Sequence, residues 1–169
     1  ANGAMYFSSA GNSGNLNDNQ SGVWEGDFQD GGTLPLFPGG TLHNFGGGVL
    51  YNTLSFTNGG SPYVLTWSDP WGNATNDYDF FVTNSAGDAI VALTSNQAMF
   101  PVEWIIGPLT SGNRFYILRH SGAAPRALRL ATNKGFLSNG TSGATFGHNA
   151  AQKTITVAAT NAGTTYPNL

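Results

Sequence analysis

Three aspartates in the middle of the chain are the best candidates for binding a metal ion. They are Asp69, Asp77 and Asp79, and asparagines lie between the first two. Carboxylate, amide and carbonyl oxygens are the ligands that Ca²⁺ prefers, so a loop rich in them is a candidate calcium site. The spacing does not match an EF-hand loop. The alternative is that Asp69 and Asp77 accept hydrogen bonds from turn amides while Asp79 pairs with an arginine.

A Gly-Thr-Ser triplet at residues 140–142 places a hydroxyl group six residues before His148. A serine hydroxyl becomes a good nucleophile at neutral pH only when a base and an orienting acid are arranged around it. No Asp-Thr-Gly or His-Gly-Thr motif precedes the triplet to supply them. We therefore predict that Ser142 is not a catalytic nucleophile.

Trp71 is the tryptophan that we expect to be exposed, because it follows Pro70 in a loop. An exposed indole ring is a candidate contact for a sugar or a protein. Trp67 and Trp104 lie in strand-like sequence, where a tryptophan usually packs into or over the core.

The composition indicates many short strands joined by tight turns. Only 9% of the 169 residues are charged, against about a quarter in an average domain, and 24 are glycine. The absence of cysteine excludes disulfides and thiolate metal sites. The net charge is −3 and the six basic residues form no run, which argues against nucleic-acid binding. No apolar stretch is long enough to span a bilayer.

Alternating side chains predict β-strands through most of the chain. Tyr63, Leu65 and Trp67 alternate with smaller or more polar residues. Further short strands are expected at residues 78–83, 89–93, 102–106, 114–119 and 127–131. This spacing predicts a jelly-roll-like antiparallel β-sandwich, and the best helical candidate is the short stretch 147–153.

The two ends of the chain resemble two consecutive core strands of the subtilisin-like serine proteases, the subtilases. The first motif is Phe-Ser-Ser-Ala-Gly-Asn-Ser-Gly at residues 7–14, and the second is Thr-Ile-Thr-Val-Ala-Ala-Thr at residues 154–160. The resemblance implies that Asn12 is the oxyanion-hole asparagine of an intact protease. It also implies that segments 4–9 and 154–160 pair in parallel. The family's nucleophile follows the second strand, whereas Ser142 precedes it.

The middle of the chain, residues 45–131, resembles the pre-peptidase C-terminal type of β-sandwich, a module attached to many secreted bacterial proteases. The similarity rests on Trp-Ser-Asp-Pro-Trp-Gly at residues 67–72, Asn-Asp-Tyr-Asp-Phe-Phe-Val at 76–82 and Arg-Phe-Tyr-Ile-Leu-Arg at 114–119. It implies an inserted sandwich within a protease core.

These resemblances divide the chain into a core strand with its turn (1–18), an inserted sandwich (19–134, the sandwich proper at about 45–131) and a return to the core (135–169). They imply an internal fragment of a secreted or cell-surface serine endopeptidase that acts on proteins or peptides. The fragment lacks the catalytic Asp, His and Ser, so we expect it to be inactive alone. The alternative is a free-standing β-sandwich module for adhesion or carbohydrate binding, and a coplanar pair of exposed aromatic rings would favour it.

Overall fold

The computed structural model describes residues 5–95 and 99–159, and these residues form twelve strands and two short 3-10 turns. The strands are β1 (Tyr6–Ser9), β2 (Val23–Asp27), β3 (Gly40–Leu42), β4 (Asn52–Thr57), β5 (Tyr63–Trp67), β6 (Tyr78–Thr83), β7 (Ile90–Thr94), β8 (Val102–Ile105), β9 (Arg114–His120), β10 (Ala127–Thr132), β11 (Gly135–Leu137) and β12 (Thr154–Val157). The turns are η1 (Leu16–Asp18) and η2 (Gly147–Ala150).

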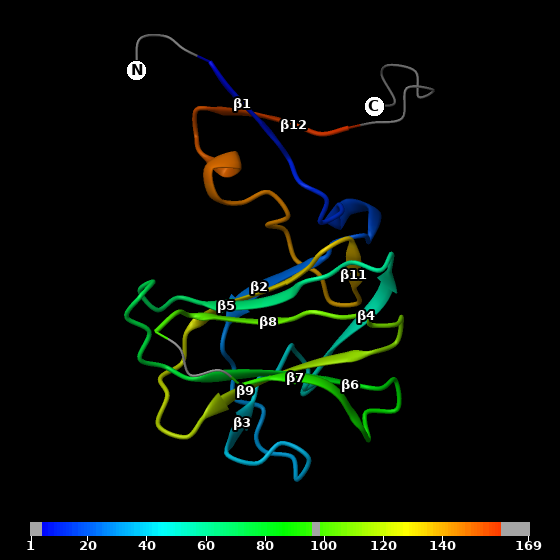
Figure 1. Ribbon diagram of the computed structural model, residues 1–169, viewed down its shortest axis with the longest axis vertical. Helices are drawn as coiled ribbons and strands as arrows, with labels where there is room; N and C mark the ends of the chain where they lie inside the picture. The colour runs from blue at the N-terminus through cyan, green and yellow to red at the C-terminus, as the bar shows by residue number, and fades with distance from the viewer. Residues whose placement is uncertain (1–4, 96–98, 160–169) are drawn as a thin grey trace.

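Ten of these strands form two antiparallel sheets that pack face to face (Figure 1). One sheet has the strand order β2-β10-β5-β8. The other has the order β11-β4-β9-β6-β7, with β3 pairing beside β4 along β9. The predicted antiparallel β-sandwich is therefore confirmed.

Strict alternation of side chains builds the core between the sheets. On β5, Tyr63, Leu65 and Trp67 are buried, and the residues between them are partly exposed. Phe80 and Phe115 lie opposite them on the facing sheet, with ring centroids 5.4 Å apart. Burying one such side chain contributes about 1.5–3 kcal/mol, so this layer stabilises the sandwich.

A second, smaller core covers the outer face of the larger sheet. Strand β6 is buried on both faces, because the segment before β4 folds over its outer side. The ring of Phe37 from that segment packs at a tilt against Phe81 and Tyr116, with centroid distances of 5.1 and 4.6 Å. The sequence of a strand that is covered on both sides is typically a continuous apolar run, and residues 80–82 are such a run.

His43 is fully buried among aromatic rings near the junction of these two cores. Its centroid lies 4.6 Å from those of Trp24 and Phe45. Nδ1 accepts a hydrogen bond from the backbone N–H of Gln29 at 3.1 Å, so the neutral ring carries its proton on Nε2. Burial lowers the pKa of His43 from 6.5 to about 4, and the ring is neutral at pH 7.

The two terminal strands form a separate parallel pair above the sandwich (Figure 1). Tyr6 lies opposite Thr154 and Ser9 opposite Val157, in the parallel arrangement expected from the sequence. The ends of the expected segments, Ala4 and Thr160, lie outside the described residues. Parallel strands need a long crossover between them, and here the sandwich is that crossover.

The chain leaves and rejoins the parallel pair through a neck made of residues 10–22 and 138–146. The carbonyl of Ala10 accepts a hydrogen bond from Thr145 Oγ1 at 3.2 Å. Further down, Ser21 Oγ donates to the carbonyl of Thr141 at 2.7 Å. The outgoing and returning segments therefore run side by side.

Two expectations about local structure need correction. The expected helix at residues 147–153 is a single 3-10 turn, Gly147–Ala150, because the chain turns at once into β12. Sequence reasoning also missed the edge strand β2. Its Glu-Gly-Asp ending has low strand propensity, and cross-strand pairing with β10 is what holds it extended.

Candidate functional site

Asn12 lies in the turn directly after β1, where the neck begins. Gly11 before it has φ = +91°, a conformation that glycine adopts without steric cost. The backbone N–H of Ala10 still pairs with the carbonyl of Val157 at 2.9 Å, so the parallel ladder continues up to the turn. The Asn12 side chain is exposed. A strand therefore presents an amide donor at its carboxyl end, open to solvent.

Asn12 shares one hollow of about 480 Å³ with residues of the sandwich. The other lining residues are Phe56 and Asn58 from the end of β4, Lys134 from the turn between β10 and β11, and Phe136 from β11. Phe56 and Phe136 stack with centroids 4.8 Å apart and 27° between their planes. The hollow therefore joins the terminal strand pair to the sandwich.

The three aspartates of the candidate calcium loop do not converge. Asp69 is buried and binds Arg126, with 2.5 Å between Oδ1 and Nε. Its carboxylate also accepts hydrogen bonds from the backbone N–H groups of Thr75 and Asn76 at 2.9 and 2.8 Å. Asp69 thus closes its own loop and pairs with an arginine.

The electrostatics of Asp69 follow from these contacts. Burial alone would raise the pKa of the Asp69 carboxyl. The hydrogen bonds from Arg126, Asn76 and Thr75 outweigh burial and hold that pKa well below its ordinary range. The carboxylate is ionised at neutral pH, and its lone pairs are already taken.

The other two aspartates meet a histidine that sequence reasoning did not single out. His120 Nε2 lies 2.8 Å from Asp79 Oδ2 and 3.4 Å from Asp77 Oδ2. One donor atom from each residue falls within 4.8 Å of the others. A nitrogen and two carboxylates suit Zn²⁺ better than Ca²⁺, which prefers six or more oxygens. His120 is 41 residues beyond Asp79 in the chain, and only the β6–β9 pairing brings them together.

Trp71 is 70% exposed, as its loop position predicts. It lies beside Phe100, with centroids 4.9 Å apart and 42° between the ring planes. Because of that tilt, the two rings do not make one flat platform. Trp104 is also exposed, on the outer face of β8, although its sequence context suggested a core or lid position.

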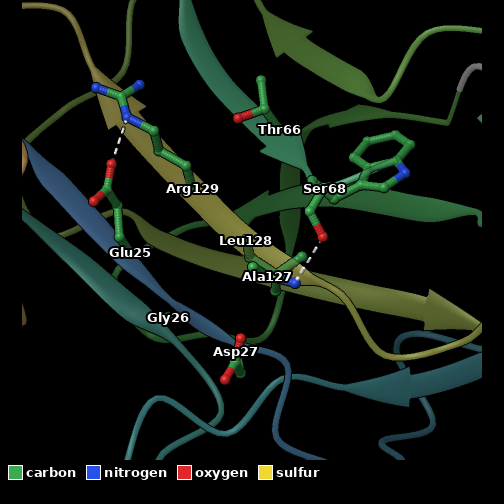
Figure 2. A pocket seen from close by; sticks show the side chains of 9 residues that line it. Glu25, Gly26, Asp27, Thr66, Ser68, Ala127, Leu128 and Arg129 are labelled. Carbon is green, nitrogen blue, oxygen red and sulfur yellow. Dashed lines mark hydrogen bonds and ion pairs between the residues drawn. The ribbon is translucent and has the colours of Figure 1, made fainter. Parts of the chain in front are cut away.

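The outer face of the four-stranded sheet carries a shallow hollow of about 460 Å³ (Figure 2). Figure 2 shows Glu25 reaching Arg129 across the strands, with 2.9 Å between Oε1 and Nε. Phe146 packs against the same guanidinium, with 3.9 Å between Cζ of Arg129 and the centroid of the Phe146 ring. Glu25 and Arg129 neutralise each other here, so we interpret this hollow as an ordinary sheet surface.

The Gly-Thr-Ser triplet is part of the neck and is held against the edge strand β2. The backbone N–H of Thr141 donates to the carbonyl of Val23 at 2.8 Å. Thr141 Oγ1 in turn accepts from the backbone N–H of Glu25 at 2.8 Å. These contacts give the triplet a structural role next to the sandwich. The side chain of His148 lies outside the described residues.

No helix in the described part of the chain is long and apolar enough to cross a membrane. No protein-family model matches this sequence, and no curated protein matches it either.

Proposed function

We propose that this chain is an internal part of a secreted, subtilisin-like serine endopeptidase and that it consists mainly of that enzyme's inserted β-sandwich. The observation that carries the proposal is the apolar face of the terminal strand pair, formed by Met5, Phe7, Ile155 and Val157. These side chains are 73%, 57%, 42% and 54% exposed. Parallel strands are normally buried on both faces, so such a pair is expected inside a larger sheet.

The opposite face of the pair supports the same interpretation. Asn149 in η2 bonds to the hydroxyls of Ser8 and Thr156, so η2 contacts part of this face, while Tyr6 on the same face is 52% exposed. An open apolar face beside it is typical of a surface that another part of a protein covers. Among the described residues, β1 and β12 pair only with each other, so a further strand could extend the pair at either edge.

Asn12 is placed to act as an oxyanion-hole donor in this proposal. Its amide follows the parallel strand and faces solvent, so its N–H can donate to the oxygen of a peptide carbonyl as negative charge develops there. The catalytic Asp, His and Ser come from other parts of the enzyme. The sandwich then binds substrate or a partner, or stabilises the enzyme, and the fragment alone does not hydrolyse peptides.

A free-standing module for adhesion or carbohydrate binding is the competing function. It would use exposed aromatic rings as a flat surface, and the tilted pair of Trp71 and Phe100 does not offer one. It also leaves the apolar face of the terminal pair unexplained.

The proposal is tested by reading the gene on both sides of this segment and assaying its full-length product. We expect Asp-Thr-Gly and His-Gly-Thr motifs upstream and a Gly-Thr-Ser-Met-Ala motif downstream. In that product, Asn12→Ala should lower kcat about 10²- to 10³-fold with little change in KM. Asn15→Ala, in the same neck, is the matched control. Absence of the flanking motifs would refute the protease proposal.

A further inference from the structure

We propose that the sandwich supplies a substrate subsite beside Asn12 and that this subsite binds a peptide with an apolar residue next to an acidic one. The inference rests on the protease proposal above, since it assigns the peptide as substrate. The subsite is the hollow lined by Asn12, Phe56, Asn58, Lys134 and Phe136.

The apolar part of the hollow is the stacked pair Phe56 and Phe136. Phe56 is 46% exposed, which is a large open aromatic surface on a strand end. Their stacking holds both rings in place, so the protein loses little side-chain entropy when a peptide side chain packs on them. An apolar side chain of the peptide is the group that gains most from this contact.

The charged part of the hollow is Lys134, the one ionic group among its lining residues. Lys134 lies in the turn that crosses from β10 in one sheet to β11 in the other, with φ = +62°. The turn is held in place by the neighbouring Asn133, whose Nδ2 donates to the carbonyl of Ser61 at 2.8 Å. A fixed backbone under an exposed ammonium group favours a carboxylate on the ligand.

The polar amides complete the complementarity with a peptide. Asn12 and Asn58 each offer a donor and an acceptor to peptide N–H and C=O groups. The hollow therefore combines backbone recognition, an apolar wall and one cation. Because the wall and the cation come from the sandwich, the insert sets the selectivity and the strand pair supplies the oxyanion donor.

The test is an NMR titration of the 169-residue chain with three blocked hexapeptides that differ only at their two central residues, Leu-Asp, Leu-Asn or Gly-Asp. We expect the Leu-Asp peptide to shift the amide signals of Asn12, Phe56 and Phe136 saturably. The Leu-Asn peptide should bind about two- to fivefold more weakly, which is the effect of one exposed charge pair. The Gly-Asp peptide, which lacks the leucine, should bind about tenfold more weakly than the Leu-Asp peptide.

Three variants separate the contributions. Lys134→Gln should remove the preference for Asp over Asn, whereas Lys153→Gln, the matched change at the other lysine, should retain it. Phe56→Ser should remove the preference for leucine over glycine while leaving the preference for Asp. Unchanged amide spectra away from the hollow show that each variant is folded.

Equal affinity of the unsubstituted chain for the Leu-Asp and Leu-Asn peptides, or no saturable shift at the hollow, would overturn this inference and leave the protease proposal standing. Absence of the flanking protease motifs would instead overturn the protease proposal and, with it, the assignment of the peptide as substrate.

Discussion

Acidification should destabilise this protein through the buried ring of His43. The ring is fully buried among Trp24, Phe28 and Phe45, and burial holds its pKa at about 4 in the folded state against 6.5 when unfolded. Between these two values the unfolded chain binds one more proton than the folded chain. The free energy of unfolding therefore falls as the pH drops through this window, and it is fully retained above pH 6.5.

The magnitude follows from the two pKa values. The lowering of the pKa from 6.5 to about 4 corresponds to about 3 kcal/mol of stability, which is lost in full below pH 4. Between pH 7 and pH 4.5 the loss is about 2 kcal/mol. For a protein of this size that is a fall in Tm of about 4–8 °C.

The assay is urea unfolding at pH 7 and at pH 4.5, with tryptophan fluorescence as the probe of unfolding. His43→Gln keeps a carbonyl oxygen that can accept from the Gln29 N–H but does not titrate. This variant should be less stable at pH 7. Between pH 7 and pH 4.5, however, its free energy of unfolding should fall by about 2 kcal/mol less than that of the unsubstituted protein. His120→Gln, the matched change at a partly exposed histidine that pairs with Asp79, should keep the His43 contribution. An identical pH dependence in the His43→Gln variant and the unsubstituted protein would refute this reasoning.

Three further predictions concern the candidate sites. Asp69→Ala should lower the free energy of unfolding by about 3–5 kcal/mol, because it leaves Arg126 and two loop amides without their acceptor. The control Asp88→Ala, on the surface, should lower it by less than about 1 kcal/mol. Equal urea midpoints for the two variants would contradict this. The melting temperature should be the same in millimolar calcium and in chelator, because Asp69 is already bonded elsewhere; a calcium-dependent rise abolished by Asp77→Ala would show that the aspartates do form a site. The 169-residue chain should neither cleave casein nor be labelled at Ser142 by a fluorophosphonate, and stoichiometric labelling there would mean that the triplet is a nucleophile after all.

Local patterns in the sequence predicted much of the fold. Strands β5 and β6 are visible because their apolar residues alternate or run continuously and turns bound them. The short strands β3 and β11 are not visible, since three residues carry no periodicity and their neighbours alone keep them extended. The parallel terminal pair was predicted from the motif resemblance, because no local signal links segments about 150 residues apart.

The candidate sites depended on distant residues and were predicted less completely. The sequence places Asp77 and Asp79 together, but their partner His120 comes from another strand. The hollow beside Asn12 needs Phe56 and Lys134, which lie 44 and 122 residues further along the chain. Nothing in the local sequence around His43 indicates that the ring is buried, because its burial is the result of tertiary packing.

The neck also determines how easily the sandwich can be replaced by protein engineering. Gly11 and Ala144 face each other across it, 3.8 Å from a Cβ built on the glycine to the alanine carbonyl oxygen, so the ends of the intervening segment nearly touch. A segment with adjoining ends can be exchanged for a short turn, or for a different domain, without moving the strands that carry it. The sandwich can thus be exchanged as a unit: replacing residues 13–143 by a tight loop would remove it, and replacing them by another domain would attach a new surface to the same strand pair.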